Sequence, residues 1–289
     1  MKACFIGFDV GASSIKAVVV EDKKMIRKQI SRTPDNLQGL LNCLAEIFEK
    51  LIVGINPRKI KGIGFSLAGI LDVERRKMLR SANIKYLDGQ PLKKLLQQKF
   101  KNYRIKLEHD VHCFLLAEKE IGQAQKFKNI FYLTLGSGIG GAWMVDGRIF
   151  FGTHGAAGEI GHTIINVVNQ KCFSLEELAA NKFIKRKLDI DAVEAWQRAE
   201  RGDRRSQAVL DGLGRNLGIG LANIINIFDP EAIFLAGGIS LAKKFIQKGI
   251  KNSLEKFVYL PPAQKTKIIF SRLGRYAGAF GATLLFSKK

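Results

Sequence analysis

Short apolar runs and amphipathic segments alternate along the whole chain. Near its start, residues 4–10 form a short apolar run, and residues 15–20 are rich in β-branched side chains. Only the small residues 11–14 separate these two runs. Runs of this composition on either side of a small-residue turn are typical of a β-hairpin. The chain is therefore predicted to open with a strand, a tight turn and a second strand.

The same arrangement recurs further along the chain. The apolar residues 130–135 lead into the glycine-rich segment 136–141, and residues 142–145 form a second apolar run. A shift of 125 positions places Gly11 on Gly136. Similarity at a fixed separation indicates an internal repeat. We interpret the two hairpins as the openings of two duplicated units, with a chance match as the alternative.

The remaining segments show helical or strand-like spacing of their apolar residues. Predicted helices cover residues 37–51, 92–100, 174–188, 191–201, 206–227 and 276–286, with a further helix beginning at Val111, and predicted strands cover residues 63–67, 105–108 and 233–236. Alternation of helices and strands is typical of α/β proteins. No low-complexity linker separates the halves, so a domain boundary near residues 113–125 is inferred from the repeat alone.

Composition narrows the class of protein. The chain has 289 residues, of which 46% are hydrophobic and 25% charged. Such a chain can bury one large core or two ordinary ones, which excludes a disordered or fibrous protein. Its four cysteines are too scattered for a disulfide scaffold, so we expect a reducing, cytoplasmic setting. Because no apolar run approaches the roughly 18 residues of a membrane-spanning helix and no signal-peptide core is present, no membrane association is expected.

The formal net charge of +21 raises the question of an anionic partner. Nucleic acid, an anionic membrane and phosphorylated small molecules are the first classes to consider. The lysines and arginines occur in short groups over the whole length and form no single basic arm. This distribution indicates a basic solvated surface that helps to attract an anionic nucleotide, and no specific nucleic acid is expected.

The two small-residue turns are candidate phosphate-binding loops. Where side chains are small, backbone N–H groups can approach an anion closely, and residues 136–141 allow this better than almost any other segment. Asp9 lies at the end of the first strand, where a carboxylate could hold a hydrated Mg²⁺. The alternative is that both turns are ordinary tight hairpins.

Asp110 follows a predicted strand and precedes the predicted helix at Val111. It is either the N-cap of that helix or a carboxylate presented in a cleft. In the second case it could serve as a general base for a hydroxyl group, which needs only one well-placed carboxylate. Phosphoryl transfer also demands positioning, charge neutralisation and an oriented nucleophile.

Glu159 and His162 form an E-x-x-H pair within a glycine-rich neighbourhood. On a helix, such a pair could face a metal. The glycines of residues 152–161 instead favour a loop, in which the pair would hydrogen-bond to a polyhydroxylated ligand. A polar loop without any ligand is the third interpretation.

Taken together, five motifs resemble those of the ROK family of sugar kinases and repressors, within the actin-like ATPase superfamily. They are two phosphate motifs at residues 6–14 and 133–141, a family signature at 152–162, an adenosine motif at 233–240 and a terminal helix at 276–284. The resemblance implies an α/β, two-lobed actin-like ATPase (ribonuclease H-like) fold with duplicated β-hairpin-containing domains. On this basis the N-terminal lobe comprises residues 1–115, joined by the terminal helix 276–289, and the C-terminal lobe comprises residues 116–275.

The resemblance also implies roles for individual residues. Asp110 would be the catalytic base that takes the proton from the attacking sugar hydroxyl. The nucleotide would be bound by Asp9, Gly11, Ala12, Ser13, Ser14, Gly136, Ser137, Gly138, Gly237 and Gly238. The sugar would be bound by Gly69, Asn83, His109, Asp110, Glu159, His162 and Glu176.

Three departures from the family pattern matter. The first turn reads Gly11-Ala12-Ser13 where the family usually has Gly-Gly-Thr, which keeps a hydroxyl but loses a glycine. His109 stands where the family usually has a sugar-contacting Asn, and its bulkier, potentially charged ring is expected to alter substrate choice or affinity. The family's Cys-x-Cys-Gly-x-x-Gly-Cys zinc loop is reduced to Cys172. Since a closed zinc site needs about four ligands, no structural zinc is expected.

The sequence therefore supports a leading hypothesis and two others. The first is an ATP- and Mg²⁺-dependent kinase that phosphorylates a hexose, glucose-like in type, with Asp110 as general base. The second is a catalytically impaired sugar or nucleotide sensor of the same family. Because the chain starts at the first phosphate strand, without a helix-turn-helix module, a DNA-binding repressor is not expected. The third hypothesis is nucleic-acid binding through the basic surface. For the oligomeric state, the family resemblance implies a homodimer.

Overall fold

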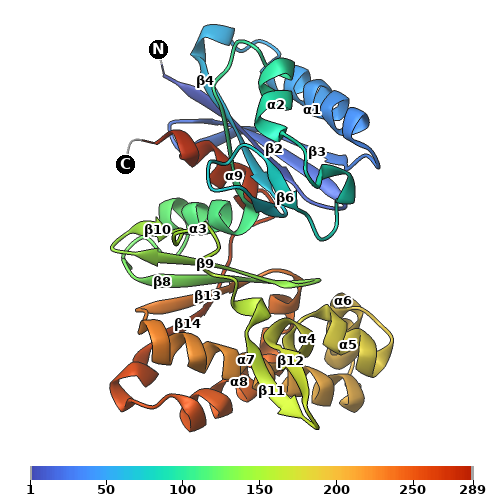
Figure 1. Ribbon diagram of the computed structural model, residues 1–289, viewed down its shortest axis with the longest axis vertical. Helices are drawn as coiled ribbons and strands as arrows, with labels where there is room; N and C mark the ends of the chain where they lie inside the picture. Colours follow the sequence, from blue (N-terminus) through green and yellow to red (C-terminus); the bar gives the residue numbers. More distant parts are fainter. Residues whose placement is uncertain (1, 288–289) are drawn as a thin grey trace. The chain divides into compact units, whose positions relative to one another are not determined.

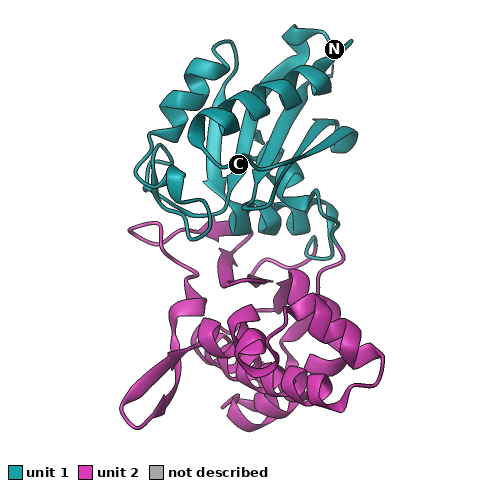
Figure 2. Ribbon diagram, turned by 90° about the vertical axis from the view of Figure 1, so that its right-hand side faces the viewer, with its two compact units in different colours: residues 1–125, 273–289 teal, residues 126–272 magenta. Residues whose placement is uncertain are grey.

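The computed structural model describes residues 2–287, which divide into two compact units (Figure 2). Of the described residues, unit 1 comprises 2–125 and 273–287, and unit 2 comprises 126–272. The predicted limit after residue 115 falls within helix α3 (Asp110–Ile121), which belongs to unit 1 as a whole. The division between the units therefore lies after this helix.

Unit 1 contains a five-stranded sheet with its first strand in the centre. The strand order is β3 (Lys24–Arg32), β2 (Ser14–Glu21), β1 (Cys4–Val10), β4 (Ile60–Leu67) and β7 (Ile105–His109). β1 pairs antiparallel with β2 and parallel with β4, and β4 pairs parallel with β7. The predicted opening hairpin is present, with Val10 opposite Ile15. A small separate hairpin is formed by β5 (Ile70–Leu71) and β6 (Met78–Arg80).

Alternate residues of β2 face opposite layers of helices, as expected for a strand of period two. Ala17 and Val19 lie in the core that also contains residues of α1 (Leu37–Ile52) and α2 (Leu92–Lys99). Val18 and Val20 pack instead with Ala117 of α3 and with α9 (Ala277–Thr283). Figure 1 shows this sheet between the two helix layers.

Helix α9 lies unusually close to the sheet. A Cβ on Gly7 of β1 would overlap the carbonyl oxygen of Ala279, and a Cβ on Gly64 of β4 would overlap that of Ala282. On the other side of the helix, a Cβ on Gly281 would overlap the carbonyl oxygen of Cys113. Glycine at these three positions allows backbone-to-backbone packing and explains the small residues of α9.

The sheet of unit 2 repeats the plan of unit 1. Its order is β10 (Arg148–Phe150), β9 (Ile139–Val145), β8 (Ile130–Leu135), β13 (Ala232–Ala236) and β14 (Lys267–Phe270). β8 again pairs antiparallel with the following strand and parallel with β13. Because both sheets have the same order and directions, the predicted duplication is confirmed.

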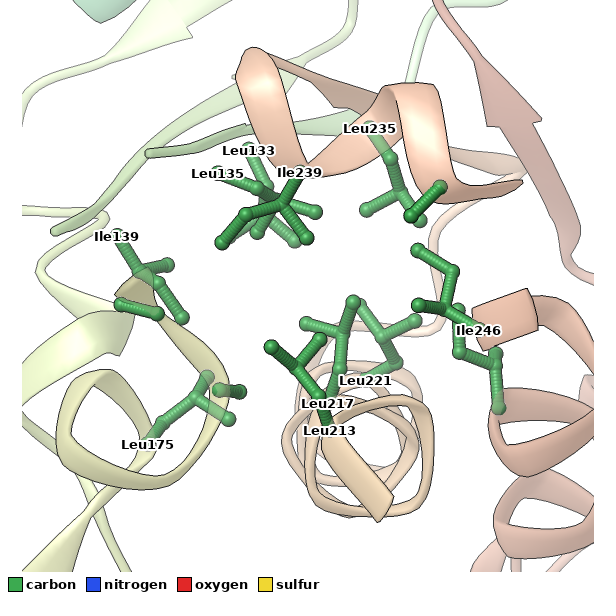
Figure 3. Close-up of a cluster of buried hydrophobic side chains, with 14 of the residues drawn as sticks. Leu133, Leu135, Ile139, Leu175, Leu213, Leu217, Leu221, Leu235, Ile239 and Ile246 are labelled. Carbon is green, nitrogen blue, oxygen red and sulfur yellow. The ribbon is translucent and has the colours of Figure 1, made fainter. Parts of the chain in front are cut away.

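Helices cover one face of this second sheet and enclose its main core. They are α4 (Leu175–Ala179), α5 (Asn181–Leu188), α6 (Ala192–Glu200), α7 (Arg204–Phe228) and α8 (Lys243–Phe257). Figure 3 shows Leu213, Leu217 and Leu221 of α7 directed toward Leu133 and Leu135 of β8. Among the described residues, each helix is too short or too polar to cross a membrane.

The segment around residue 174 differs from the predicted single helix at 174–188. Residues Ile164–Val168 (β11) and Lys171–Ser174 (β12) form a two-stranded hairpin. Ser174 then caps α4, because its hydroxyl accepts a hydrogen bond from the Glu177 N–H. The chain leaves helical geometry at Ala180 before α5 begins. The capping box at Ser174 and the break at Ala180 therefore divide the predicted helix.

Candidate active site residues

Asp9 is a buried carboxylate at the carboxyl end of β1. The residue is 5% exposed. Ser66 Oγ on β4 donates a hydrogen bond to Asp9 Oδ1 at 2.7 Å, and Lys16 Nζ lies 3.5 Å from Oδ2. Burial raises the pKa of Asp9, while Lys16 and Ser66 oppose this shift. A Cβ on Gly278 of α9 would lie 2.7 Å from the carboxylate, so this site also depends on glycine in the helix.

The first small-residue turn, residues 11–14, is held by hydrogen bonds to Thr33 and is exposed at its tip. Gly11 N donates to Ser14 O at 3.1 Å, and the Thr33 hydroxyl donates to Gly11 O at 2.7 Å. Thr33 N also donates to Ser13 O at 3.3 Å. Ala12 and Ser13 are exposed. The turn therefore presents these two residues outward on a backbone anchored by Thr33.

Asp110 is the first residue of α3 rather than its N-cap. The N-cap position belongs to His109, whose side chain makes no capping hydrogen bond. Asp110 is half-buried, and its Oδ1 accepts a hydrogen bond from the Val111 N–H at 2.8 Å. A carboxylate is favoured at the N-terminus of a helix, where the helix dipole is positive. Asp110 is thus a partly accessible carboxylate at the junction of strand and helix.

Glu108, immediately before this junction, is the centre of a buried polar network. Its Oε1 accepts hydrogen bonds from Arg75 Nε at 2.8 Å, His112 Nδ1 at 3.0 Å and the backbone N–H of His109 at 2.9 Å. Burial raises the pKa of Glu108, but the His112 hydrogen bond and the positive charge of Arg75 outweigh it and leave the pKa below its usual range. Glu108 is therefore an ionised anchor for the segment that carries Asp110.

His109 is buried and neutral. Its Nε2 accepts a hydrogen bond from the Leu71 backbone N–H at 3.2 Å. Burial, with contributions from His112 and Arg75, lowers the pKa of His109 to about 4. This finding corrects the expectation of a potentially charged ring at physiological pH. Because Nε2 is an acceptor, the neutral ring carries its proton on Nδ1.

The second turn, in unit 2, lies between β8 and β9. Gly136 N donates to Gly138 O at 2.9 Å. Within the described part of the chain, the peptide N–H groups of Ser137 and Gly138 have no hydrogen-bond partner. Consecutive unpaired peptide N–H groups in a turn form a concave site for an anion. The geometry of this turn is therefore suited to a phosphate group.

Four of the five glycines predicted to bind the nucleotide divide into two kinds. Gly136 and Gly238 have open space where a Cβ would lie, and Gly11 would meet only Ser14 O at 3.4 Å. None of the three has a positive φ, so the fold itself would accept a side chain there. Gly237 differs, because its φ is +95° and a Cβ would overlap Leu135 O. Gly237 is required by the turn, whereas the open positions leave room for a ligand.

The Glu159 to His162 segment packs flat against the start of β9. Gly158 and Gly141 meet backbone to backbone, and a Cβ on Gly161 would overlap Ile139 O. His162 Nε2 lies 3.9 Å from Glu159 Oε2, and both side chains are exposed. Among residues 2–287, no group of three or more His, Cys, Asp or Glu side chains could hold a metal ion. The arrangement is a loop with a short 3₁₀ turn, which leaves the pair open to a polar ligand.

Three further predicted residues occupy different environments. Glu176 lies at the second turn, where its Oε2 accepts a hydrogen bond from the Ile139 N–H. Gly69 follows β4, and a Cβ there would lie 2.8 Å from the backbone oxygen of Arg80, so packing already requires glycine. Asn83 is exposed in the segment after β6. Cys172, the surviving residue of the zinc motif, is an exposed free thiol on β12.

Each unit thus gathers its own set of functional candidates. In unit 1, burial raises the pKa of the Cys113 thiol, and the carboxylates of Glu108, Asp9 and Asp110 raise it further. These three carboxylates come from β7, β1 and α3, so these three elements meet near Cys113. Sequence reasoning missed Ser66, Arg75 and Glu108. Ser66 carried a signal, since it is a polar residue near the carboxyl end of a strand whose other residues from Gly62 onward are apolar.

The fold and these residues define a class of protein. Two units with five-stranded sheets of identical order, each with a small-residue turn after its first strand, constitute the two-lobed actin-like ATPase fold. Within this class, residues 5–289 match the model of the ROK family. The chain belongs to the ROK family.

Relatives within the family differ in what they do. The chain is 29% identical to an uncharacterised protein of Clostridium perfringens, with 98% of each chain covered. It is 27% identical to a xylose repressor of Caldicellulosiruptor bescii, covering 96% of this chain and 76% of the repressor. It is also 27% identical to a glucokinase of Halalkalibacterium halodurans, covering 99% of this chain and 95% of the kinase.

Solved structures share the fold. A ROK hexokinase from Thermus thermophilus is 27% identical, with a TM-score of 0.81 over 98% of this chain and 97% of that one. A ROK family glucokinase from Streptomyces griseus, in complex with glucose and AMPPNP, is 23% identical, with a TM-score of 0.84 over 98% of this chain and 99% of that one. The second likeness shows the fold alone.

Proposed function

We propose that the protein is an ATP- and Mg²⁺-dependent kinase that phosphorylates a hydroxyl of a hexose, glucose-like in type. The observation that carries the proposal is the partly accessible Asp110 at the start of α3, anchored by the ionised Glu108. A general base needs access to the substrate and a fixed position. The kinases among its relatives support the same reaction class.

The open glycines support nucleotide binding. Gly136 and Gly238 leave space that the fold does not itself require, and the N–H groups of Ser137 and Gly138 are available to an anion. A phosphate placed there would be bound by fixed backbone dipoles, as in other phosphate-binding turns. In unit 1, the exposed Ala12 and Ser13 would provide the corresponding contact. ATP therefore fits the residues present.

Asp9 would hold the Mg²⁺ that accompanies ATP. Mg²⁺ keeps most of its waters and is usually bound through one or two carboxylates and the phosphates of the substrate. Asp9 fits this role because its carboxylate lies at the end of β1, beside the cation of Lys16 and the hydroxyl of Ser66. When bound, the ion would neutralise charge on the phosphates.

Asp110 would take the proton of the sugar hydroxyl as the hydroxyl oxygen attacks the γ-phosphorus of ATP. The bond to the β–γ bridging oxygen breaks, and ADP leaves with that oxygen. By the family resemblance, Glu159 and His162 would hydrogen-bond to other hydroxyls of the sugar, and Gly69, Asn83 and His109 would also be sugar-binding residues. The neutral ring of His109 would act there as a hydrogen-bond donor through Nδ1.

A second candidate is a sugar or nucleotide sensor without turnover. The repressor that aligns over 96% of this chain favours it, as does His109 at a position where the family usually has Asn. The two candidates make the same prediction for binding and different predictions for chemistry. A sensor binds ATP or a sugar and releases no ADP.

A substrate screen separates them. Purified protein would be incubated with ATP, Mg²⁺ and a panel of hexoses and amino sugars, and ADP release would be measured by a coupled assay. Asp110→Asn should lower kcat by about 10²-fold or more while ATP binding by calorimetry is retained. Asp35→Asn, an exposed aspartate of the same unit, is the matched control. Near-normal turnover in Asp110→Asn would rule out the base assignment, and binding without ADP release in the wild type would support the sensor.

A further inference from the structure

The carboxylate of Glu176 lies directly against the second glycine turn. Its Oε2 accepts a hydrogen bond from the N–H of Ile139, the first residue of β9, at 2.9 Å. A Cβ on Gly138 would overlap the same oxygen. Gly138 does not have a positive φ, and the three atoms nearest to such a Cβ all belong to the Glu176 carboxyl group. Glu176 therefore packs directly on the turn.

The segment that carries Glu176 is itself fixed. Leu175 N donates to Thr163 O at 2.8 Å, which ties the start of α4 to the residue after His162. At the start of α5, Asn181 N donates to Gly136 O at 3.0 Å. Helices α4 and α5 thus hold the two ends of the turn, Gly136 through its carbonyl group and Ile139 through its N–H.

The charge of Glu176 is partly offset. Lys182 Nζ, from α5, lies 3.4 Å from Glu176 Oε1. The carboxylate can therefore remain next to a phosphate site with less repulsion than an isolated anion would cause. Between the two held ends, the N–H groups of Ser137 and Gly138 remain available. A turn whose ends are already ordered loses less conformational freedom when an anion binds.

We propose that Glu176 is a positioning residue for the phosphate turn, which sets the affinity for ATP, in addition to the sugar contact implied by the family resemblance. This rests on the proposed function, because the phosphates of ATP are the anion the turn would hold. The bond from Ile139 to Glu176, and not the negative charge of Glu176, is the feature that matters. An amide oxygen at the same position should therefore accept the same hydrogen bond from the Ile139 N–H.

Calorimetric titration of the full chain with ATP and Mg²⁺, without sugar, tests this independently of turnover. Glu176→Ala removes the acceptor of the Ile139 N–H and should raise the Kd for ATP about tenfold, the scale expected for the loss of one hydrogen bond. Glu176→Gln keeps an oxygen that can accept the bond and should restore most of the affinity. Thermal unfolding of each variant shows whether it is folded.

Glu177→Ala is the matched control. Its carboxylate accepts a hydrogen bond from Ser174 N at 2.8 Å in the capping box, so its loss should lower the Tm and leave the Kd for ATP unchanged. The proposal is overturned if Glu176→Ala binds ATP like the wild type, as a purely sugar-binding glutamate would, or if the Gln and Ala variants weaken ATP binding equally. A wild-type protein that does not bind ATP would overturn the proposed function itself.

Discussion

The Nε2 atom of His109 lies 3.2 Å from the backbone nitrogen of Leu71 and accepts its hydrogen. This bond requires a neutral ring nitrogen, so it fails when the imidazole is protonated. The pKa of His109 is lowered to about 4, with burial as the largest cause. An unfolded histidine has a pKa of about 6.5. Between these two values the unfolded state binds more protons than the folded state, and stability must fall as the pH falls.

We therefore expect the free energy of unfolding to decrease from pH 6.5 to pH 4, with His109 contributing about 3 kcal/mol. Above the unfolded pKa this contribution of His109 is fully present. Urea unfolding at a series of pH values would measure it. His109→Asn should flatten the profile in this range, whereas the exposed His154→Asn should not change it. An unchanged profile in His109→Asn would contradict a buried neutral ring.

The close approach of α9 to α3 gives a second prediction. A methyl group on residue 281 would overlap Cys113 O, so Gly281→Ala should lower the free energy of unfolding by about 3 kcal/mol through overpacking. Gly274→Ala is the control in the same unit, because its Cβ would enter open space. Chemical denaturation measures both. Equal stabilities for the two variants would show that the helix can move away without cost.

Asp9 gives a prediction about Mg²⁺. Asp9→Asn keeps an oxygen that can accept the Ser66 hydrogen bond but removes the charge beside Lys16. We expect a weaker dependence of ATP binding on Mg²⁺ concentration and little change in ATP affinity without Mg²⁺. Calorimetric titrations with and without Mg²⁺ test this. Ser66→Ala, which retains the carboxylate, should keep the Mg²⁺ dependence, and loss of that dependence in both variants would point to a general disturbance of the site.

The fourth prediction concerns the zinc motif, of which only Cys172 remains. Cys172 is exposed and free, so Cys172→Ser should leave the Tm and any kinase activity unchanged. Treatment with 1,10-phenanthroline in excess Mg²⁺ should also leave the Tm unchanged. Metal analysis of the purified protein is expected to give substoichiometric zinc. A stoichiometric zinc content that falls in Cys172→Ser would contradict this prediction.

Local patterns in the sequence predicted the central strands of both sheets and missed edge strands as well as helix α8. The hairpin of β1 and β2 is buried almost throughout, so its apolar residues were conspicuous. β3 and β11 are largely exposed, and their apolar residues do not form the runs that mark a buried strand. The break at Ala180 was missed because the residues on both sides of it favour helix.

The candidate site was predictable only where its residues are close in the sequence. The small-residue turns and Asp110 could be found from their position between predicted elements. The Glu108 to Arg75 bond could not, because it joins residues that lie far apart along the chain and depends on how β7 meets the segment after β5. The environment of His109 was missed for the same reason, since burial by distant residues decides its protonation.

The division of the chain also determines when, during synthesis, each unit has all its elements available to fold. Unit 2 comes from one continuous stretch, residues 126–272, so all its strands and helices are available to fold together during synthesis. Unit 1 lacks α9 until residues 277–283 have been synthesised, and until then Gly7 and Gly64 have no helix backbone to pack against. Residues 1–125 are thus synthesised before the helix that completes the packing of their sheet.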